Sequence, residues 1–169
     1  MPMIDAYIPE GALHSERETA LIDRLTRILI AAEGFDPQNP AALAASWTFL
    51  HRPALYVGGA EADAPRYKIV VTVPEGQLDE RGRSDVIAQV TEAVMDAEDG
   101  VWQRDPSRIW VFPVEMPDGH WGGRGKVMRL ADILGRLAGA DAGSARVLAE
   151  ERIARSRAER SQMPATSMP

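Results

Sequence analysis

The chain contains two copies of one unit, and this duplication limits the folds that it can adopt. The segment IPEGAL at residues 8–13 recurs as VPEGQL at residues 73–78, an offset of 65 residues. Apolar residues in the stretches that follow keep this offset and fall at i, i+1, i+4, i+8 and i+11 in both copies. That spacing places them on one face of an amphipathic helix. We therefore expect two helices at equivalent places in a repeated unit.

Each copy is predicted to form a strand, a helix and a second strand. In the first copy the alternating residues up to Ile8 predict a strand, and Trp47 to His51 predict another. Ser15 and Glu18 have the spacing of a capping box that opens the helix, which Gly34 ends. The second copy predicts a strand over 66–73, a helix over about 79–99, a strand over 108–115 and a short return strand over 127–130.

This order of elements indicates an α+β fold. A helical crossover makes the two strands of each unit parallel and puts the helix on one face of the sheet. Duplicated β-α-β units then form a four-stranded sheet with two helices on one face. The other face would expose Val70, Val111 and Trp110. We expect further subunits to cover it, and hence an oligomer.

The two repeats, about 2–60 and 66–130, are assigned to one domain over residues 1–138. Residues 139–143 form a small-residue linker, and 145–160 are charged and helix-prone with sparse apolar positions. A solvated helix is the favoured interpretation of that segment, and a partner-binding helix is the alternative. Ser161 to Pro169 are expected to be disordered.

Composition excludes several classes of protein. The chain has no cysteine, which rules out disulfides, a thiolate nucleophile and cysteine metal sites. Its net charge of −6 argues against a general nucleic-acid binder. No apolar run reaches the ~20 residues of a membrane span and no signal peptide is evident, so we expect a cytoplasmic protein that does not enter the membrane.

Pro2 is the candidate catalytic residue. Methionine aminopeptidase normally removes Met1 when a small residue such as proline follows it, and the mature chain would then begin with a secondary amine. An α-amino group titrates near ~8 in water, and burial lowers that value. Because a predicted strand holds Pro2, the amine can serve as an unprotonated base at neutral pH.

The chain resembles the tautomerase superfamily. Pro2 at the start of a strand, the duplicated units and the run VFPVEMPDGHWG at residues 111–122 carry the likeness, which covers about residues 2 to 135. That run is similar to the C-terminal strand and hairpin of 4-oxalocrotonate tautomerase. WGGRG at 121–125, together with HRP at 51–53, is similar to malonate semialdehyde decarboxylase, and GRS at 82–84 is similar to cis-3-chloroacrylic acid dehalogenase.

The resemblance implies a cofactor-independent tautomerase that forms a homotrimer. It implies Pro2 as general base, Trp121 as an aromatic wall and Arg83 as a ligand of the substrate carboxylate. Arg81 is a possible substitute for a second arginine of the dehalogenase. His51 is a further candidate for substrate contact. The expected substrate is a small carboxylated enol or α-keto acid.

Several positions depart from the pattern of known members. The arginine that follows Glu-Gly in 4-oxalocrotonate tautomerase is Gln77 here, and Glu33 replaces the helix histidine of the dehalogenase. A hydratase or decarboxylase of a short unsaturated or oxo acid, with Pro2 as acid, and a non-catalytic binding trimer therefore stay open as alternatives. Arg124 and Lys126 flank a glycine turn and are assigned to the surface or an interface.

No metal site is expected. The three histidines, His14, His51 and His120, lack the spacing of metal ligands.

Overall fold

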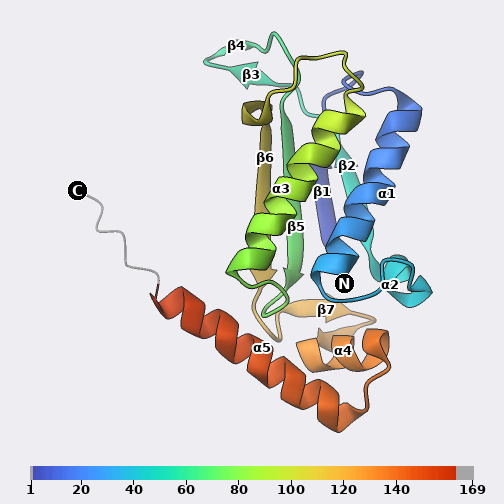
Figure 1. Cartoon of the computed structure of the whole chain (residues 1–169), viewed down its shortest axis with the longest axis vertical. Helices are drawn as coiled ribbons and strands as arrows, with labels where there is room; N and C mark the ends of the chain where they lie inside the picture. The colour runs from blue at the N-terminus through green and yellow to red at the C-terminus, as the bar shows by residue number, and fades with distance from the viewer. Residues whose placement is uncertain (1, 163–169) are drawn as a thin grey trace.

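The computed structural model describes residues 2–162 and contains the two predicted units (Figure 1). The first comprises β1 (Met3–Tyr7), α1 (Ser15–Ala32), the short helix α2 (Pro40–Ala45) and β2 (Trp47–His51). The second comprises β5 (Tyr67–Pro74), α3 (Glu80–Ala97), the 3₁₀ turn η1 (Pro106–Arg108) and β6 (Ile109–Met116). A small hairpin of β3 (Tyr56–Val57) and β4 (Ala60–Glu61) lies between them. The offset of 65 residues relates α1 to α3 without a gap.

The sheet has the order β2-β1-β5-β6. Each outer strand runs parallel to its neighbour, as a helical crossover requires, and the two units meet through antiparallel pairing of β1 with β5. Asp5 pairs with Val70 at the centre of this contact. The repeat offset of 65 makes Val70 the counterpart of Asp5 in the second unit. A residue that pairs with its own counterpart marks a local two-fold axis between the units. The predicted α+β architecture is confirmed.

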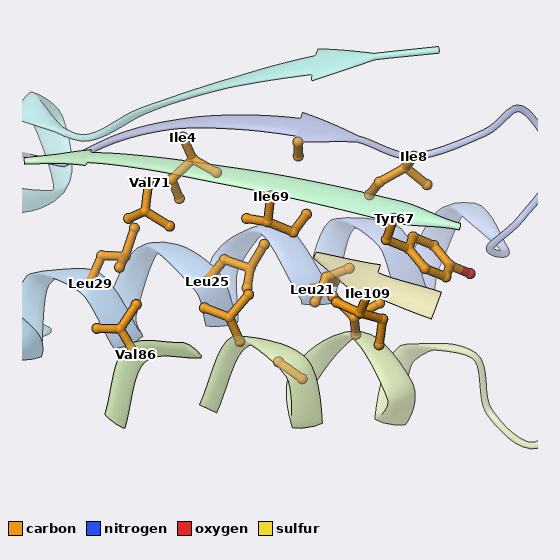
Figure 2. Packing of buried hydrophobic residues seen from close by; sticks show 14 of the residues in the cluster. Ile4, Ile8, Leu21, Leu25, Leu29, Tyr67, Ile69, Val71, Val86 and Ile109 are labelled. Atoms are coloured by element: carbon orange, nitrogen blue, oxygen red, sulfur yellow. The ribbon is translucent and has the colours of Figure 1, made fainter. Parts of the chain in front are cut away.

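The helices α1 and α3 cover the same face of the sheet and bury equivalent residues (Figures 1 and 2). The helix α1 contributes Leu21, Leu25 and Leu29 to the core, and α3 contributes the residues 65 positions later, which are Val86, Val90 and Val94. They pack on Ile4, Ile69 and Val71 from the central strands. Each such side chain contributes roughly 1.5–3 kcal/mol when fully buried. The apolar residues that repeat with the helical period in the sequence therefore form the faces of α1 and α3 that pack in the core.

The start of α1 differs from the prediction. Ser15 is the first helical residue, His14 occupies the N-cap position, and no side chain caps the helix there. Glu18 instead accepts hydrogen bonds of 2.6 and 2.7 Å from the guanidinium of Arg52. The capping box is therefore wrong, because an ion pair with a residue 34 positions away binds the carboxylate that would have closed it.

The uncovered face of the sheet is apolar and aromatic. Val111 pairs with Ile69 and packs against the core, so its expected place on this face is wrong. Val70 lies on this face as expected, and its partner Phe112 lies there in place of Val111, since both alternate with the buried residues. Trp47 and Trp110, from the two outer strands, are the most exposed aromatic residues of the face, at 64% and 66%.

The chain beyond the sheet folds across the end at which β1 begins. It forms the hairpin β7 (Trp121–Gly123) and β8 (Lys126–Met128), then α4 (Leu130–Ala138) and α5 (Ala142–Gln162). A second core forms there, where Leu130, Ile133 and Leu134 of α4 pack with Ile30 and Phe35 from the end of α1. The C-terminal part is thereby attached to the first unit.

The helix α5 is bound to the protein by ion pairs. Arg157 donates to both carboxylate oxygens of Glu75 at 3.0 and 3.1 Å, Arg160 also contacts Glu75, and Ser156 donates to Glu115 at 2.8 Å. Most residues of the helix are exposed, as expected of a solvated helix, but the sequence did not predict the side on which its arginines meet acidic residues at the ends of β5 and β6. Of the segment expected to be disordered, Ser161 and Gln162 belong to α5, and 163–169 lie outside the described residues.

Gly76 makes the close approach of α5 possible. Its φ of +85° is unfavourable for other residues, and a Cβ there would lie 2.8 Å from the backbone carbon of Arg152. Within residues 2–162 no helix is long and apolar enough to cross a membrane.

Candidate active site

Pro2 is buried at the start of β1. Its carbonyl oxygen accepts a hydrogen bond of 3.3 Å from the backbone N–H of Trp47, so the parallel pairing with β2 already begins at this residue. Ile4, Ala6 and Ile8, which follow in alternation, are buried in the main core and hold the strand. Pro2 is therefore fixed at the sheet end, unlike the first residues of most chains.

A cavity of about 580 Å³ opens beside Pro2. Small residues of α2, among them Ala41, Ala44 and Ala45, form one part of its wall, and the β7–β8 hairpin forms another. Met116 at the end of β6 and Met128 at the end of β8 add apolar surface. A volume of this size suits a small organic ligand, because ligand pockets are typically ~300–1,000 Å³ and mostly apolar.

The hairpin places Trp121 in the cavity wall. Trp121 pairs with Met128 in the β7–β8 ladder and packs on the second core. The carboxylate of Asp118 anchors the hairpin on α4, since it accepts hydrogen bonds from the side chain of Arg129 and the N–H of Leu130, both at 2.8 Å. Glu75 in turn accepts from the N–H of Asp118 at 2.9 Å. The aromatic wall therefore rests on a chain of charged hydrogen bonds.

Two arginines supply positive charge to the cavity wall. Arg124 lies in the two-residue turn of the hairpin, where it and Gly125 have φ values of +54° and +73°, as a type I′ turn requires. Arg136 lies in the last turn of α4, which Gly139 ends in the left-handed conformation. Among the described lining residues there is no aspartate or glutamate. The cavity is therefore suited to an anion rather than a cation.

The sequence did not identify these two cations as a pair. Arg124 carries a signal in the Gly-Gly-Arg-Gly turn, but a hairpin tip by itself indicates only surface. Arg136 lies just beyond the part of the chain that the tautomerase resemblance covers, and its spacing predicts nothing about a cavity formed 134 residues away by Pro2. Their common site follows only from the packing of α4 against α2, where Asn39 Nδ2 donates to the carbonyl of Leu137 at 3.0 Å.

His51 lies at the other end of β1 and β2 from Pro2. It pairs with Tyr7, which is roughly 17 Å along the strand from Pro2 at about 3.3 Å per residue. Its imidazole stacks on the Tyr7 ring with centroids 4.3 Å apart, and its Nε2 lies 2.7 Å from Asp5 Oδ1. His51 is thus on the uncovered face of the sheet and outside the wall of the Pro2 cavity.

Arg81 and Arg83, at the start of α3, are also outside the cavity wall. The guanidinium of Arg83 donates to the carbonyl of Leu78 at 3.3 Å and to Glu159 of α5 at 3.0 Å. The side chain of Arg81 is 89% exposed and lies 3.7 Å from Asp85. Within one chain the structure thus brings together Pro2 and Trp121 of the predicted set. Substrate contacts by Arg81, Arg83 and His51 stay predictions.

A buried polar cluster of Glu33, Gln77 and Arg152 lies next to the end of the sheet at which β1 begins. Glu33, at the end of α1, is 1% exposed, and Gln77 is 5% exposed. Arg152 of α5 donates to Gln77 Oε1 at 2.6 Å and to the carbonyl oxygen of Glu33 at 3.3 Å. Burial raises the pKa of the Glu33 carboxyl, and positive charge, including that of Arg152, acts in the opposite direction. Burial also lowers the pKa of Arg152.

Over residues 2–162 no group of three or more histidine, aspartate or glutamate side chains is arranged to hold a metal ion. The groups that line the cavity and can take part in chemistry are Pro2, the imidazole of His120, the hydroxyl of Thr72, two guanidiniums and the indole of Trp121.

The fold matches solved structures, whereas no protein-family model and no curated protein sequence matches the chain. One match is a fused 4-OT described as an asymmetric trimer, with 25% identity and a TM-score of 0.61, over 79% of this chain and 99% of that one. A member of the cis-3-chloroacrylic acid dehalogenase family has 18% identity and a TM-score of 0.64, over 88% of this chain and 99% of that one.

The macrophage migration inhibitory factor of Toxoplasma gondii also matches, with 15% identity and a TM-score of 0.57, over 75% of this chain and 99% of that one. These proteins share the arrangement of paired β-α-β units around one sheet. The chain therefore has the fold of the fused 4-OT structures and of the cis-3-chloroacrylic acid dehalogenase family member, which confirms the predicted tautomerase/MIF-like α+β fold.

Proposed function

We propose that the protein is a tautomerase that moves a proton on a small carboxylated enol or α-keto acid, with Pro2 as general base after removal of Met1. The observation that carries the proposal is the burial of Pro2 in the wall of a cavity whose charged lining residues are arginines. A secondary amine removed from water is easier to keep neutral, and a neutral amine can accept a proton.

The reaction needs one group that can take and return a proton. The nitrogen of Pro2 accepts the proton of the enol hydroxyl, the C–O bond becomes a carbonyl, and the nitrogen returns the proton to the carbon at the other end of the former double bond. The substrate gains and loses nothing overall. General acid–base catalysis of this kind contributes typically 10²–10⁴-fold in rate when the base lies within hydrogen-bond distance of the proton.

Arg124 and Arg136 are the proposed ligands of the substrate carboxylate. A guanidinium offers paired donors that match the two oxygens of a carboxylate, and such charge-assisted bonds are about twice as strong as neutral ones. The indole of Trp121 would cover the apolar part of the substrate. The bound molecule would therefore have its acid group near the hairpin and α4, and its reacting atoms near Pro2.

Replacement of Pro2 tests the proposal. We expect Pro2→Ala to lower the rate of tautomerisation of a model enol of pyruvate by at least 10²-fold, with an unchanged oligomer and unfolding midpoint. Mass spectrometry of the intact chain should first establish that Met1 is absent. Full activity in Pro2→Ala would reject the base. Release of carbon dioxide or hydration of short unsaturated acids, without tautomerisation, would favour the alternative in which Pro2 acts as an acid.

We also propose that three copies assemble through the uncovered face of the sheet. This face carries five large apolar residues that are each more than 40% exposed: Trp47, Phe49, Trp110, Phe112 and Val114. Exposed apolar patches of this extent are typical of interaction sites in soluble proteins. The matched fused 4-OT, itself described as a trimer, supports the number three.

A further inference from the structure

The two-fold relation between the units gives the residues of the first unit near Pro2 a counterpart in the second unit. In the antiparallel ladder Met3 pairs with Thr72 and Tyr7 with Lys68, so the offset of 65 converts one pair into the other. The same offset converts Pro2 into Tyr67 and Glu33 into Glu98. Along the outer strands the offset is 63, because Met3 pairs with Trp47 and Lys68 with Trp110. The counterpart of Arg108 is therefore Ala45.

In the second unit these positions form a filled, buried cluster. Tyr67 donates its hydroxyl to Glu98 Oε1 at 3.0 Å, and Arg108 donates to both oxygens of the same carboxylate at 2.5 Å. Tyr67, Glu98 and Arg108 are 2%, 2% and 4% exposed. Burial is the main cause that raises the pKa of the Tyr67 hydroxyl, so the phenol stays neutral and acts only as a donor. This cluster is structural, since its three buried side chains satisfy one another's hydrogen bonds.

In the first unit the same place is a cavity. Pro2 replaces the phenol and Ala45 replaces the guanidinium, and both residues line the cavity wall. The carboxyl group is retained, since Glu33 is buried at the end of α1 in the way that Glu98 is buried at the end of α3. Replacing two large side chains by two small ones explains why the place that Tyr67 and Arg108 fill in the second unit belongs to a cavity in the first.

One cation near Glu33 comes from the C-terminal helix. Arg152 donates to the carbonyl oxygen of Glu33, and Gln77, on the loop between β5 and α3, is its other acceptor. Once Met1 is removed, the amine of Pro2 is the titratable group that the two-fold relation puts opposite Glu33 from β1. Opposite charges within ~4–6 Å favour each other's charged form, so a carboxyl and an amine at that separation would titrate as a coupled pair.

We propose that Glu33 is a positioning residue for Pro2: its carboxyl group, held at the place that Glu98 occupies beside Tyr67, sets the pH at which the ring nitrogen loses its proton. The inference rests on the proposed function, because it needs the amine that removal of Met1 creates. An ionised Glu33 makes Pro2 the weaker acid and keeps a proton in the site. A protonated Glu33 leaves the nitrogen free to act as a base.

The titration of the nitrogen itself tests this without any turnover. The protein would be labelled with ¹⁵N-proline, and the shift of the Pro2 nitrogen followed from pH 4 to 10 in the unmodified chain and in Glu33→Gln. We expect the apparent pKa of the nitrogen to fall by about one unit in Glu33→Gln, because the negative neighbour is lost. Glu98→Gln is the matched control, at the equivalent position of the other unit, and should leave that pKa unchanged.

A second measurement covers the case in which Glu33→Gln does not fold. In the unmodified chain the ¹⁵N shift should have a second inflection at the pH where the ¹³C-labelled carboxyl of Glu33 titrates, since coupled groups share their apparent pKa values. A single inflection, or an unchanged pKa in a folded Glu33→Gln, would overturn the inference even if the protein is a tautomerase. An inactive protein with the coupled titration would reject the proposed function alone, and retention of Met1 would reject both.

Discussion

Tyr67 stands in the second unit where Pro2 stands in the first, and the difference between these two residues separates a structural site from a cavity. The phenol of Tyr67 extends to Glu98 and, with Arg108, fills the space behind the strand. Pro2 has no side chain that can reach so far, and the cavity lies beside it. One duplicated framework thus carries a filled polar cluster in the second unit and a cavity at the equivalent place in the first.

The first prediction concerns the cations of the cavity. Arg124→Gln and Arg136→Gln should each raise KM for a carboxylated enol about 10-fold. A charge-assisted hydrogen bond contributes ~1.5–3 kcal/mol, and the exposure of both residues places the effect at the lower end of that range. The value of kcat should change little, since neither residue moves the proton. Steady-state kinetics on purified variants provides the measurement.

Arg146→Gln is the control for the cavity arginines. Arg146 is an exposed arginine of α5 that contacts only Glu150 among the described ion pairs, at 3.5 Å. Its replacement should leave KM unchanged. If Arg124→Gln and Arg136→Gln both bind substrate as well as the unmodified protein, the carboxylate lies elsewhere, and Arg83 becomes the next residue to replace.

The second prediction concerns pH and the attachment of α5. The hydrogen bonds from Arg157, followed by those from the N–H of Asp118 and from Arg160, lower the pKa of Glu75 to about 2, although burial opposes the shift. A carboxyl whose pKa is lower in the folded state than in the unfolded state stabilises the fold above the unfolded pKa. This contribution should therefore be complete above about pH 5 and disappear as the pH falls from ~4.5 towards 2.

Glu75→Gln is the variant that separates this effect from general acid denaturation. Its free energy of unfolding should be lower than that of the unmodified chain at pH 7, and the difference should shrink between pH 4.5 and 2. Urea unfolding followed by circular dichroism at a series of pH values gives both numbers. Glu150→Gln, in an exposed pair on the same helix, should cost less than ~0.5 kcal/mol at every pH. A constant difference for Glu75→Gln would contradict the assigned role.

The third prediction concerns the uncovered face of the sheet. Trp110→Glu should convert the proposed trimer into monomers, because a charge placed in an apolar interface must be desolvated without a partner. Light scattering coupled to size-exclusion chromatography measures the mass directly.

Val147→Glu provides the comparison for that experiment. Val147 is an apolar residue on α5 that is 53% exposed, away from the sheet. Its replacement should leave the oligomer intact. A trimer that survives Trp110→Glu would mean that the subunits meet through another surface.

The sequence by itself determined the repeated unit, the two helices, the strand order within each unit and the position of Pro2 at a strand start. These features are recorded locally, because a helical or alternating period identifies the buried face of an element whatever it packs against. The predicted capping box and the predicted exposure of Val111 were wrong because both depend on contacts with distant parts of the chain. A distant arginine bound Glu18, and the pairing register decided which side of β6 faces the core.

Only the tertiary structure decided what surrounds Pro2. Arg124, Arg136 and Arg152 belong to segments whose sequences are typical of surface turns and solvated helices, and the attachment of α4 and α5 across the sheet end gives them their positions. The role proposed for Glu33 also depends on the tertiary structure, because it follows from the two-fold relation that makes Glu33 the counterpart of Glu98. A period along the chain specifies a face but not a neighbour, whereas a catalytic site is made of neighbours that come from distant parts of the chain.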